Sequence, residues 1–311
     1  MRVVFFGTPL FALPSLDALL AAGFDIPLVV SRADRPAGRH LELTRPPVVV
    51  AAERLGLAVA QPNKLGVDEF FRPFGELRPD VAVVVAFGRL ITPRVLDVPR
   101  LGFVNVHPSL LPRHRGPTPI ETAILEGDAE TGVTTMLLDE GFDTGPVLLQ
   151  RAVPIGPRDR TATLEPLLAR VGAELLVETL HALAAGSLVP QPQDERAATV
   201  TTKLERKMGR IDWTLPATTL DRRGRAFDPF PGLYSNFRGA RVKVHDIRVG
   251  GATAGNEPPG TVIDVSPAGI AVRCGAGTVA VLGELQREGK RRLPADAFIL
   301  GERVARGERF N

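Results

Sequence analysis

Two runs of apolar residues, 2–6 and 81–87, have the length and continuous hydrophobicity of strands buried on both faces of a sheet. Residues 26–30 form a weaker run of the same kind. Apolar side chains at helical spacing occur at 14–22, 47–55 and 163–183. Because strand patterns alternate with helical ones, the chain is predicted to fold as an open, doubly wound α/β domain with a parallel sheet.

The pattern changes after residue 187. Residues 188–203 are polar, contain prolines and show little periodicity, which is typical of an extended linker between domains. From residue 204 onward, one helical pattern is followed by short strand-like runs separated by Gly and Pro turns, at 241–249, 260–265, 270–273 and 278–282. We therefore expect an α/β domain over residues 1–187, the linker 188–203, and a small β-barrel over residues 204–311.

Composition narrows the class of protein. The 311 residues are 44% hydrophobic and 23% charged, which excludes broad disorder. No apolar stretch approaches the roughly 18 residues of a membrane span, and no secretory signal is recognisable, so a cytoplasmic protein with no membrane partner is expected. The single Cys274 excludes an internal disulfide, and the five histidines lack metal-ligating spacing, so no metal site is expected.

Positive charge is concentrated in the last third of the chain. The formal net charge is only +3, yet residues 201–311 contain 19 Lys and Arg against 12 Asp and Glu. Clustered basic residues are what a phosphate-rich partner requires, so the excess suggests that the C-terminal part contacts a polyanion. A solvated basic face would produce the same count, and both interpretations stay open at this point.

Two polar residues interrupt an apolar strand pattern at 103–107. Asn105 and His107 are two positions apart, so their side chains project on one face of the strand, with Val104 and Val106 on the other. Pro108 ends the strand and places both polar groups at its carboxyl end, where open α/β sheets bind ligands. The pair is therefore a candidate catalytic site.

A glycine-bracketed acidic loop, residues 139–145, follows the next apolar stretch and contains Asp143. Its carboxylate could be held against the imidazole of His107. Taken singly, however, a histidine at a strand end is usually a structural hydrogen-bonding residue, and an aspartate in a glycine-rich loop is usually a turn former. Residue types and spacing alone leave both possibilities open.

Longer motifs add a resemblance. The segments Asn105-x-His107, residues 109–112 (SLLP) and residues 143–145 (DTG) resemble the signature of the formyltransferases that use 10-formyltetrahydrofolate. Further stretches resemble the branch of this family that formylates methionyl-tRNA, namely 6–9, 34–39, 113–116, 132–134, 209–213 and 289–292. The chain departs from that pattern at His114, Pro117, Thr118 and Phe230.

The resemblance implies a two-domain enzyme. A Rossmann-like formyltransferase domain with an open parallel sheet would be followed by a barrel of the oligonucleotide/oligosaccharide-binding (OB) type. The reaction would move a formyl group from 10-formyltetrahydrofolate to the α-amino group of initiator methionyl-tRNA, through a tetrahedral oxyanion. Asn105 would donate a hydrogen bond to the oxyanion, His107 would transfer protons, and Asp143 would orient the imidazole.

Binding residues follow from the same resemblance. The expected folate contacts are Arg89, Leu90, Ile91, Ser109, Leu110, Leu111, Pro112 and Asp139. The expected tRNA contacts are Arg39, Arg206, Lys207, Arg210, Lys290 and Arg291. Folate would be the co-substrate and initiator methionyl-tRNA the partner, with no metal, and the chain is expected to act as a monomer.

Other classes of protein share some of these features. Glycinamide ribonucleotide and nucleotide-sugar formyltransferases share the Asn, His and Asp, but the former are shorter and lack a barrel. A non-catalytic RNA-binding protein would not need Asn105, His107 and Asp143. A nicotinamide-dependent dehydrogenase would need a Gly-x-Gly-x-x-Gly fingerprint, and the turn after the first strand reads Gly7-Thr8-Pro9 instead.

Overall fold

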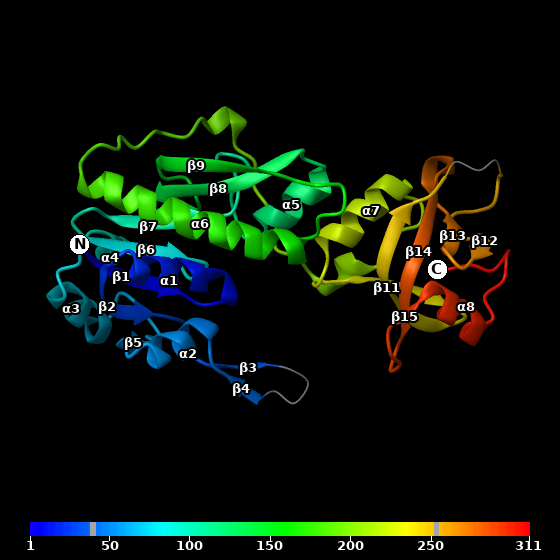
Figure 1. The fold of residues 1–311 in the computed structure, drawn as a ribbon, viewed down its shortest axis with the longest axis horizontal. Coiled ribbons are helices and arrows are strands. Elements are labelled where there is room, and N and C mark those ends of the chain that lie inside the picture. Colours follow the sequence, from blue (N-terminus) through cyan, green and yellow to red (C-terminus); the bar gives the residue numbers. More distant parts are fainter. Residues whose placement is uncertain (38–41, 252–254) are drawn as a thin grey trace. The chain divides into compact units, whose positions relative to one another are not determined.

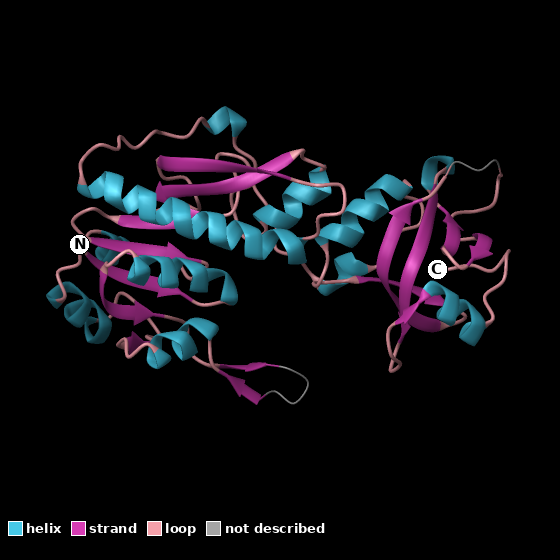
Figure 2. Cartoon of the chain, in the orientation of Figure 1, coloured by secondary structure: helices cyan, strands magenta, loops and turns pink. Residues whose placement is uncertain are grey.

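The computed structural model describes residues 1–37, 42–251 and 255–311. Contacts divide the chain into two compact units, each with a sheet of its own. The first unit comprises residues 1–119, 130–154 and 165–201, and the second comprises residues 120–129, 155–164 and 202–311. Figure 1 traces the chain through both units, and Figure 2 distinguishes their helices and strands.

A seven-stranded sheet forms the centre of the first unit, in the order β5-β2-β1-β6-β7-β8-β9. Its strands are β1 (Arg2–Gly7), β2 (Asp25–Val30), β5 (Val59–Ala60), β6 (Val81–Val85), β7 (Phe103–His107), β8 (Glu130–Leu137) and β9 (Val147–Pro154). Neighbours from β5 to β7 are parallel, whereas β8 and β9 are antiparallel additions at one edge. The predicted open sheet is confirmed, and the antiparallel edge is a feature that the apolar runs did not predict.

The other helices and strands up to residue 201 include segments of the second unit, within residues 120–129 and 155–164. They are η1 (Leu10–Ala12), α1 (Leu13–Ala21), the paired strands β3 (Arg35–Ala37) and β4 (Glu42–Thr44), α2 (Pro47–Arg54), α3 (Asp68–Glu76), α4 (Pro93–Leu96), α5 (Pro119–Glu126), α6 (Thr161–Ala184) and η2 (Glu195–Ala197). The helical patterns predicted at 14–22, 47–55 and 163–183 correspond to α1, α2 and α6. Helix α3 was not predicted because Pro73 and Gly75 interrupt its pattern.

Helix α6 covers one face of the sheet, as Figure 1 shows. Gly172 permits the close approach, because a Cβ at this position would lie 2.8 Å from Cγ1 of Val106. The hydroxyls of Thr179 in α6 and Thr135 in β8 are 2.8 Å apart and share a hydrogen bond. Since Val106 faces α6, the alternation of β7 directs Asn105 and His107 to the opposite face.

That opposite face has an aromatic core. The ring of Phe6 in β1 makes edge contacts with Phe74 of α3 and with Phe87, at centroid distances of 5.8 and 5.4 Å. Phe103, at the start of β7, belongs to the same buried cluster. The core therefore fixes the beginning of the strand whose other end carries Asn105 and His107.

The second unit contains an antiparallel sheet in the order β10-β11-β14-β13-β12, with β15 paired to β14. Its elements are η3 (Arg206–Gly209), α7 (Ala217–Ala226), β10 (Leu233–Phe237), β11 (Ala240–Val249), β12 (Val262–Ser266), β13 (Gly269–Arg273), η4 (Gly275–Gly277), β14 (Val279–Arg287), β15 (Leu293–Pro294) and α8 (Ala295–Glu302). Phe310 pairs with Phe237 and Arg309 with Thr261, so the last residues join the two ends of the sheet. The predicted C-terminal β domain is confirmed. No helix in the described part of the chain combines the length and apolarity needed to cross a membrane.

Candidate active site

Asn105 and His107 lie in β7, the last of the parallel strands, and are only 8% and 4% exposed. The strand ends at His107 because Pro108 has no N–H with which to continue the ladder. The structure therefore places an amide and an imidazole together at the carboxyl end of β7, as the alternation of the sequence predicted.

Asp143 approaches His107 from the loop between β8 and β9. Its Oδ2 lies 3.6 Å from Nδ1 of His107, and it accepts a hydrogen bond of 2.8 Å from the N–H of Gly116. The backbone of Asp143 has φ +56°, a left-handed conformation that aspartate and asparagine adopt more readily than most residues. The distance to Nδ1 exceeds a direct hydrogen bond but permits a strong interaction with an imidazolium.

The other ring nitrogen of His107 is also engaged. Nε2 lies 3.0 Å from the carbonyl oxygen of His114. A carbonyl only accepts hydrogen bonds, so Nε2 carries the proton in this contact, and in the neutral ring the lone pair belongs to Nδ1. His114 itself has φ +60°, and its N–H donates to the hydroxyl of Thr199 at 2.8 Å. The nitrogen that can accept a proton therefore faces Asp143.

Ser109, Leu110, Leu111 and Pro112 form one turn directly after β7. The Ser109 hydroxyl donates to the carbonyl of Arg113 at 2.7 Å, and the hydroxyl of Thr134 donates to the carbonyl of Ser109 at 2.6 Å. Ser109 and Leu111 are buried, and the peptide bond between Leu111 and Pro112 is cis. The turn is thus held by one local hydrogen bond and by the hydroxyl of Thr134 in β8, which also accepts from the N–H of Leu111 at 3.1 Å.

Asp139 shapes the loop that holds Asp143. Its Oδ1 accepts hydrogen bonds from the N–H of Gly141 at 3.0 Å and from the hydroxyl of Thr144 at 2.8 Å. Gly145 closes the loop, because a Cβ there would lie 1.9 Å from the carbonyl oxygen of Leu137. This steric requirement explains the glycine in the Asp-Thr-Gly motif.

A network of polar side chains supports the loops from outside. The guanidinium of Arg115 is 6% exposed and makes two hydrogen bonds to the carboxylate of Glu195, at 2.8 and 2.9 Å. This contact raises the pKa of Arg115 and lowers the pKa of Glu195. The same guanidinium donates to the side-chain oxygen of Gln193. Gln193 and Glu195 lie in the segment predicted as a linker, whose lack of periodicity concealed these roles.

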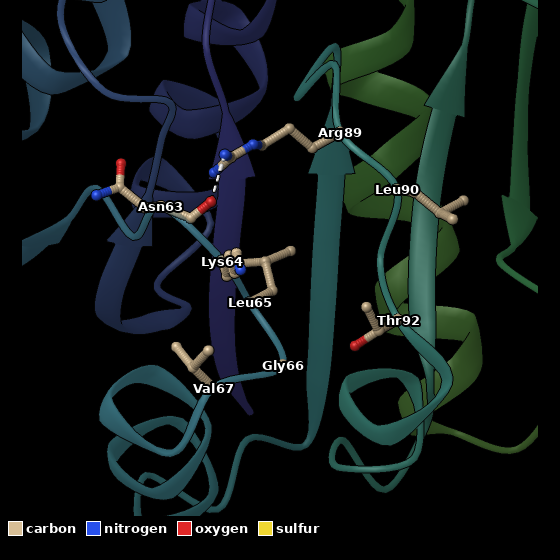
Figure 3. A pocket seen from close by; sticks show the side chains of 8 residues that line it. All are labelled: Asn63, Lys64, Leu65, Gly66, Val67, Arg89, Leu90 and Thr92. Carbon is tan, nitrogen blue, oxygen red and sulfur yellow. Dashed lines mark hydrogen bonds between the residues drawn. The ribbon is translucent and has the colours of Figure 1, made fainter.

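A cavity of about 480 Å³ lies beside Arg89 and Leu90, within the size range of small-molecule sites. Figure 3 shows its lining residues, which are Asn63, Lys64, Leu65, Gly66, Val67, Arg89, Leu90 and Thr92. Arg89 donates to the carbonyls of Pro62 and Asn63 at 2.6 and 2.5 Å, which ties together two walls of the cavity. Ile91, the next residue, is buried in the aromatic core and does not line the cavity. Asn105, His107 and Asp143 do not line this cavity.

The described residues among the predicted tRNA contacts all belong to the second unit. Arg206, Lys207 and Arg210 lie in or next to η3 and are exposed, as are Lys290 and Arg291 in the turn after β14. Lys207 forms a surface ion pair with Glu205 at 2.8 Å. Arg39 lies outside the described residues. In the ranges that are described, no group of three His, Cys, Asp or Glu side chains could hold a metal ion.

Comparison with known families covers nearly the whole chain. The model of the family described as formyl transferase matches residues 1–180, and the model of the formyl transferase C-terminal domain matches residues 203–303.

Curated relatives named methionyl-tRNA formyltransferase include the following two proteins. The protein from Aromatoleum aromaticum is 46% identical over 100% of this chain and 97% of its own length. The protein from Roseiflexus sp. strain RS-1 is 47% identical over 100% of this chain and 95% of its own length. Among solved structures, HypX from Aquifex aeolicus in complex with tetrahydrofolic acid shares the fold, with a TM-score of 0.64 and 19% identity. That match covers 96% of this chain, which spans only about half (47%) of HypX.

Proposed function

The chain belongs to the formyl transferase family, and we propose that it transfers a formyl group from 10-formyltetrahydrofolate to the α-amino group of initiator methionyl-tRNA. The observation that carries this proposal is the match to methionyl-tRNA formyltransferases over the whole of this chain and at least 95% of each relative. Such a match includes the C-terminal β domain as well as the catalytic unit. The match therefore favours a formyltransferase over the two alternatives, a non-catalytic RNA-binding protein and a dehydrogenase.

Asn105 is the proposed oxyanion donor. The amine attacks the formyl carbon, a C–N bond forms, and the carbonyl electron pair moves onto oxygen. The side-chain N–H of Asn105 donates a hydrogen bond to that oxygen, and its burial strengthens the interaction. Removal of one such donor typically slows turnover about 100- to 1,000-fold.

His107 is the proposed proton carrier, with Asp143 as its partner. Nδ1 holds the lone pair because Nε2 donates to the carbonyl of His114, so Nδ1 accepts the proton that leaves the attacking amine. The resulting imidazolium is stabilised by the carboxylate of Asp143. When the intermediate collapses, the bond from the formyl carbon to folate N10 breaks, and Nδ1 returns the proton to N10.

The cavity beside Arg89 is the proposed site for part of the folate. Leu65, Val67 and Leu90 offer apolar contacts to a flat aromatic group, and the cations of Lys64 and Arg89 suit the carboxylates of a folate tail. HypX, which shares the fold, binds tetrahydrofolic acid. The remaining proposed folate contacts are Ile91, Ser109, Leu110, Leu111, Pro112 and Asp139.

The proposal assigns a separate role to each domain. Residues 1–187 carry folate binding and catalysis, residues 188–203 connect the domains, and residues 204–311 bind tRNA. The exposed cations of that last part contact phosphates and position the tRNA, together with Arg39 from the first domain. The enzyme acts as a monomer in the cytoplasm, where its tRNA substrate is used.

The test is formyl transfer by the purified chain. Initiator methionyl-tRNA is compared with elongator methionyl-tRNA, an amino sugar and glycinamide ribonucleotide, each with 10-formyltetrahydrofolate. Preference for the initiator tRNA is expected. Transfer to a small amine alone would contradict the proposed tRNA-binding role of the C-terminal domain. No transfer to any acceptor would refute the proposal.

Two variants test the proposed roles of His107 and Arg39 separately. His107→Gln keeps a donor for the His114 carbonyl but has no proton acceptor of suitable pKa, and it should lose about 99% of turnover or more with folding intact. Arg39→Ala should raise the KM for tRNA without changing the KM for folate. Equal losses for both substrates would contradict the role of Arg39.

A further inference from the structure

One side-chain amide joins the two loops that contact His107. Nε2 of Gln193 donates to the carbonyl oxygens of Asp143 and Gly145, at 2.9 and 2.7 Å. Oε1 of the same side chain accepts hydrogen bonds from Nε and Nη2 of Arg115, at 3.0 and 2.9 Å. The NH2 group of this amide thus bonds the Asp143 loop, and its oxygen bonds the loop of residues 113–116.

Both loops need an external restraint. Asp143 and His114 have φ angles of +56° and +60°, and each of these residues presents the atom that contacts a ring nitrogen of His107. Left-handed conformations of residues other than glycine persist only where the surrounding structure enforces them. The hydrogen bond from the Gly116 N–H to the Asp143 carboxylate links the loops once. Gln193 links them again, from the backbone carbonyls of Asp143 and Gly145 to the guanidinium of Arg115.

The segment that presents Gln193 is itself anchored. On one side, Gln191 and Val147 exchange two backbone hydrogen bonds of 2.8 Å. On the other side, the N–H of Arg115 donates to the carbonyl of Thr199 at 2.9 Å, and the N–H of Thr201 donates to the carbonyl of Arg115 at 2.7 Å. Residues 191–201 therefore run along the catalytic unit as a strap with Gln193 between its two attachments.

We propose that Gln193 is a positioning residue for formyl transfer, whose amide sets the distance between the Asp143 loop and the loop of residues 113–116. That distance decides whether Asp143 lies beside Nδ1 of His107 while the His114 carbonyl holds Nε2. Without the amide, the carboxylate withdraws from Nδ1 and proton acceptance loses its electrostatic support. The inference deepens the proposed function and rests on it for its kinetic test only.

Two substitutions separate the parts of the amide. Gln193→Ala removes the donor and the acceptor. Gln193→Glu keeps the shape and the acceptor for Arg115 but replaces the NH2 by an oxygen that faces two carbonyl oxygens, so the Asp143 loop is released. Gln191→Ala is the matched control, because the Gln191 amide donates to the carbonyl of Val189 within its own segment, at 3.1 Å.

The kinetic test measures kcat and both KM values. A displacement of about 1 Å at a reacting group can cost about 100-fold in rate, so Gln193→Ala and Gln193→Glu should lower kcat about 10- to 100-fold. The KM for 10-formyltetrahydrofolate should stay within about twofold, and Gln191→Ala should match the wild type. An unchanged kcat in Gln193→Ala, a defect confined to KM, or recovery of kcat in Gln193→Glu would overturn the proposal. If Gln193→Ala fails to fold, Gln193→Glu carries the test.

A spectroscopic test does not depend on activity. In protein labelled with 15N-histidine, the ring nitrogen signals of His107 are assigned by their loss in His107→Gln. Both Gln193 variants should shift the Nδ1 signal, and Gln191→Ala should not. Superimposable His107 signals in wild type and Gln193→Ala would overturn the inference. If the wild type transfers no formyl group, the proposed function fails while this measurement still decides the role of Gln193.

Discussion

Nδ1 of His107, at the end of β7, lies 3.6 Å from Oδ2 of Asp143, in the loop after β8. Because β7 and β8 are antiparallel, β8 ends beside the start of β7, where the Leu138 N–H donates to the Phe103 carbonyl. The loop after β8 therefore has to fold back to bring Asp143 to His107. The contact gives the imidazole a partner whose charge is useful only when Nδ1 is protonated. In the proposed reaction, the contact supports the proton transfer, and we expect it to have little effect on substrate binding.

The first prediction tests that charge. Asp143→Asn keeps the size of the side chain and its tolerance of a left-handed backbone, so the loop should remain folded. Without the carboxylate, the imidazolium loses its stabilisation, and kcat should fall about 100-fold while both KM values stay within about threefold. Steady-state kinetics and a melting curve measure both effects. Asp17→Asn, on the exposed side of α1, is the control and should match the wild type. A wild-type kcat in Asp143→Asn would exclude the role of Asp143.

The second prediction concerns Asn105. Asn105→Ala removes the N–H donor and should lower kcat about 100- to 1,000-fold, because the donor acts on the oxyanion that exists only along the reaction path. Asn105→Asp should be no better, since a carboxylate cannot donate and repels the developing charge. Rapid-quench measurement of a single turnover isolates this step. A change in KM at constant kcat would show that Asn105 only binds substrate.

The sequence predicted the sheet and the position of His107 for a simple physical reason. Strands β1 and β6 are buried on both faces, so their residues are continuously apolar, and the polar pair in β7 stands out against that background. Asp143 was a weaker candidate, because nothing local reveals which side chain a loop carboxylate will meet. Its proximity to His107 depends on how the loop folds back from the end of β8, which pairs with the start of β7.

The role of residues 191–201 could not be predicted in the same way. Gln193 contacts Asp143 through one hydrogen bond and Arg115 through two, and such contacts between loops leave no periodicity in the sequence. The segment is polar and extended because it pairs through its backbone and its amides, and a solvated linker has the same composition. Composition therefore identified the polarity of the segment, but not the short helix η2 within it or the contacts that it makes.

The third prediction concerns the glycine of the Asp-Thr-Gly motif. A Cβ at Gly145 would lie 1.9 Å from the carbonyl oxygen of Leu137, and a backbone atom of a paired strand cannot move aside easily. Gly145→Ala should therefore cost about 2–4 kcal/mol of stability. In contrast, a Cβ at Gly75, in α3, meets no atom within 4 Å, and Gly75→Ala should be neutral or stabilising by up to about 1 kcal/mol. Urea titration of both variants measures the difference. Equal stabilities would show that the loop can relax around the added methyl group.

The last prediction concerns Cys274, which is 2% exposed between β13 and β14. Burial disfavours the thiolate and raises the pKa of this thiol from 9.0 to about 11. Between these two values the unfolded chain releases the proton while the folded chain retains it, so folding stability falls as the pH rises from about 9 to about 11. Below about pH 9 both states are protonated, and the thiol then adds no pH dependence.

Cys274→Ala isolates this contribution. The substitution removes packing contacts at every pH, but it also removes the titrating group, so the variant should lose less stability than the wild type as the pH is raised. Between about pH 8 and about pH 10.5 the difference should reach about 2 kcal/mol, because the folded thiol resists an ionisation that the unfolded thiol undergoes. Urea titrations of both proteins at the two pH values measure it, and the remaining titrating groups cancel in the comparison. Parallel losses of stability would mean that the buried thiol ionises in the folded protein as easily as in the unfolded chain.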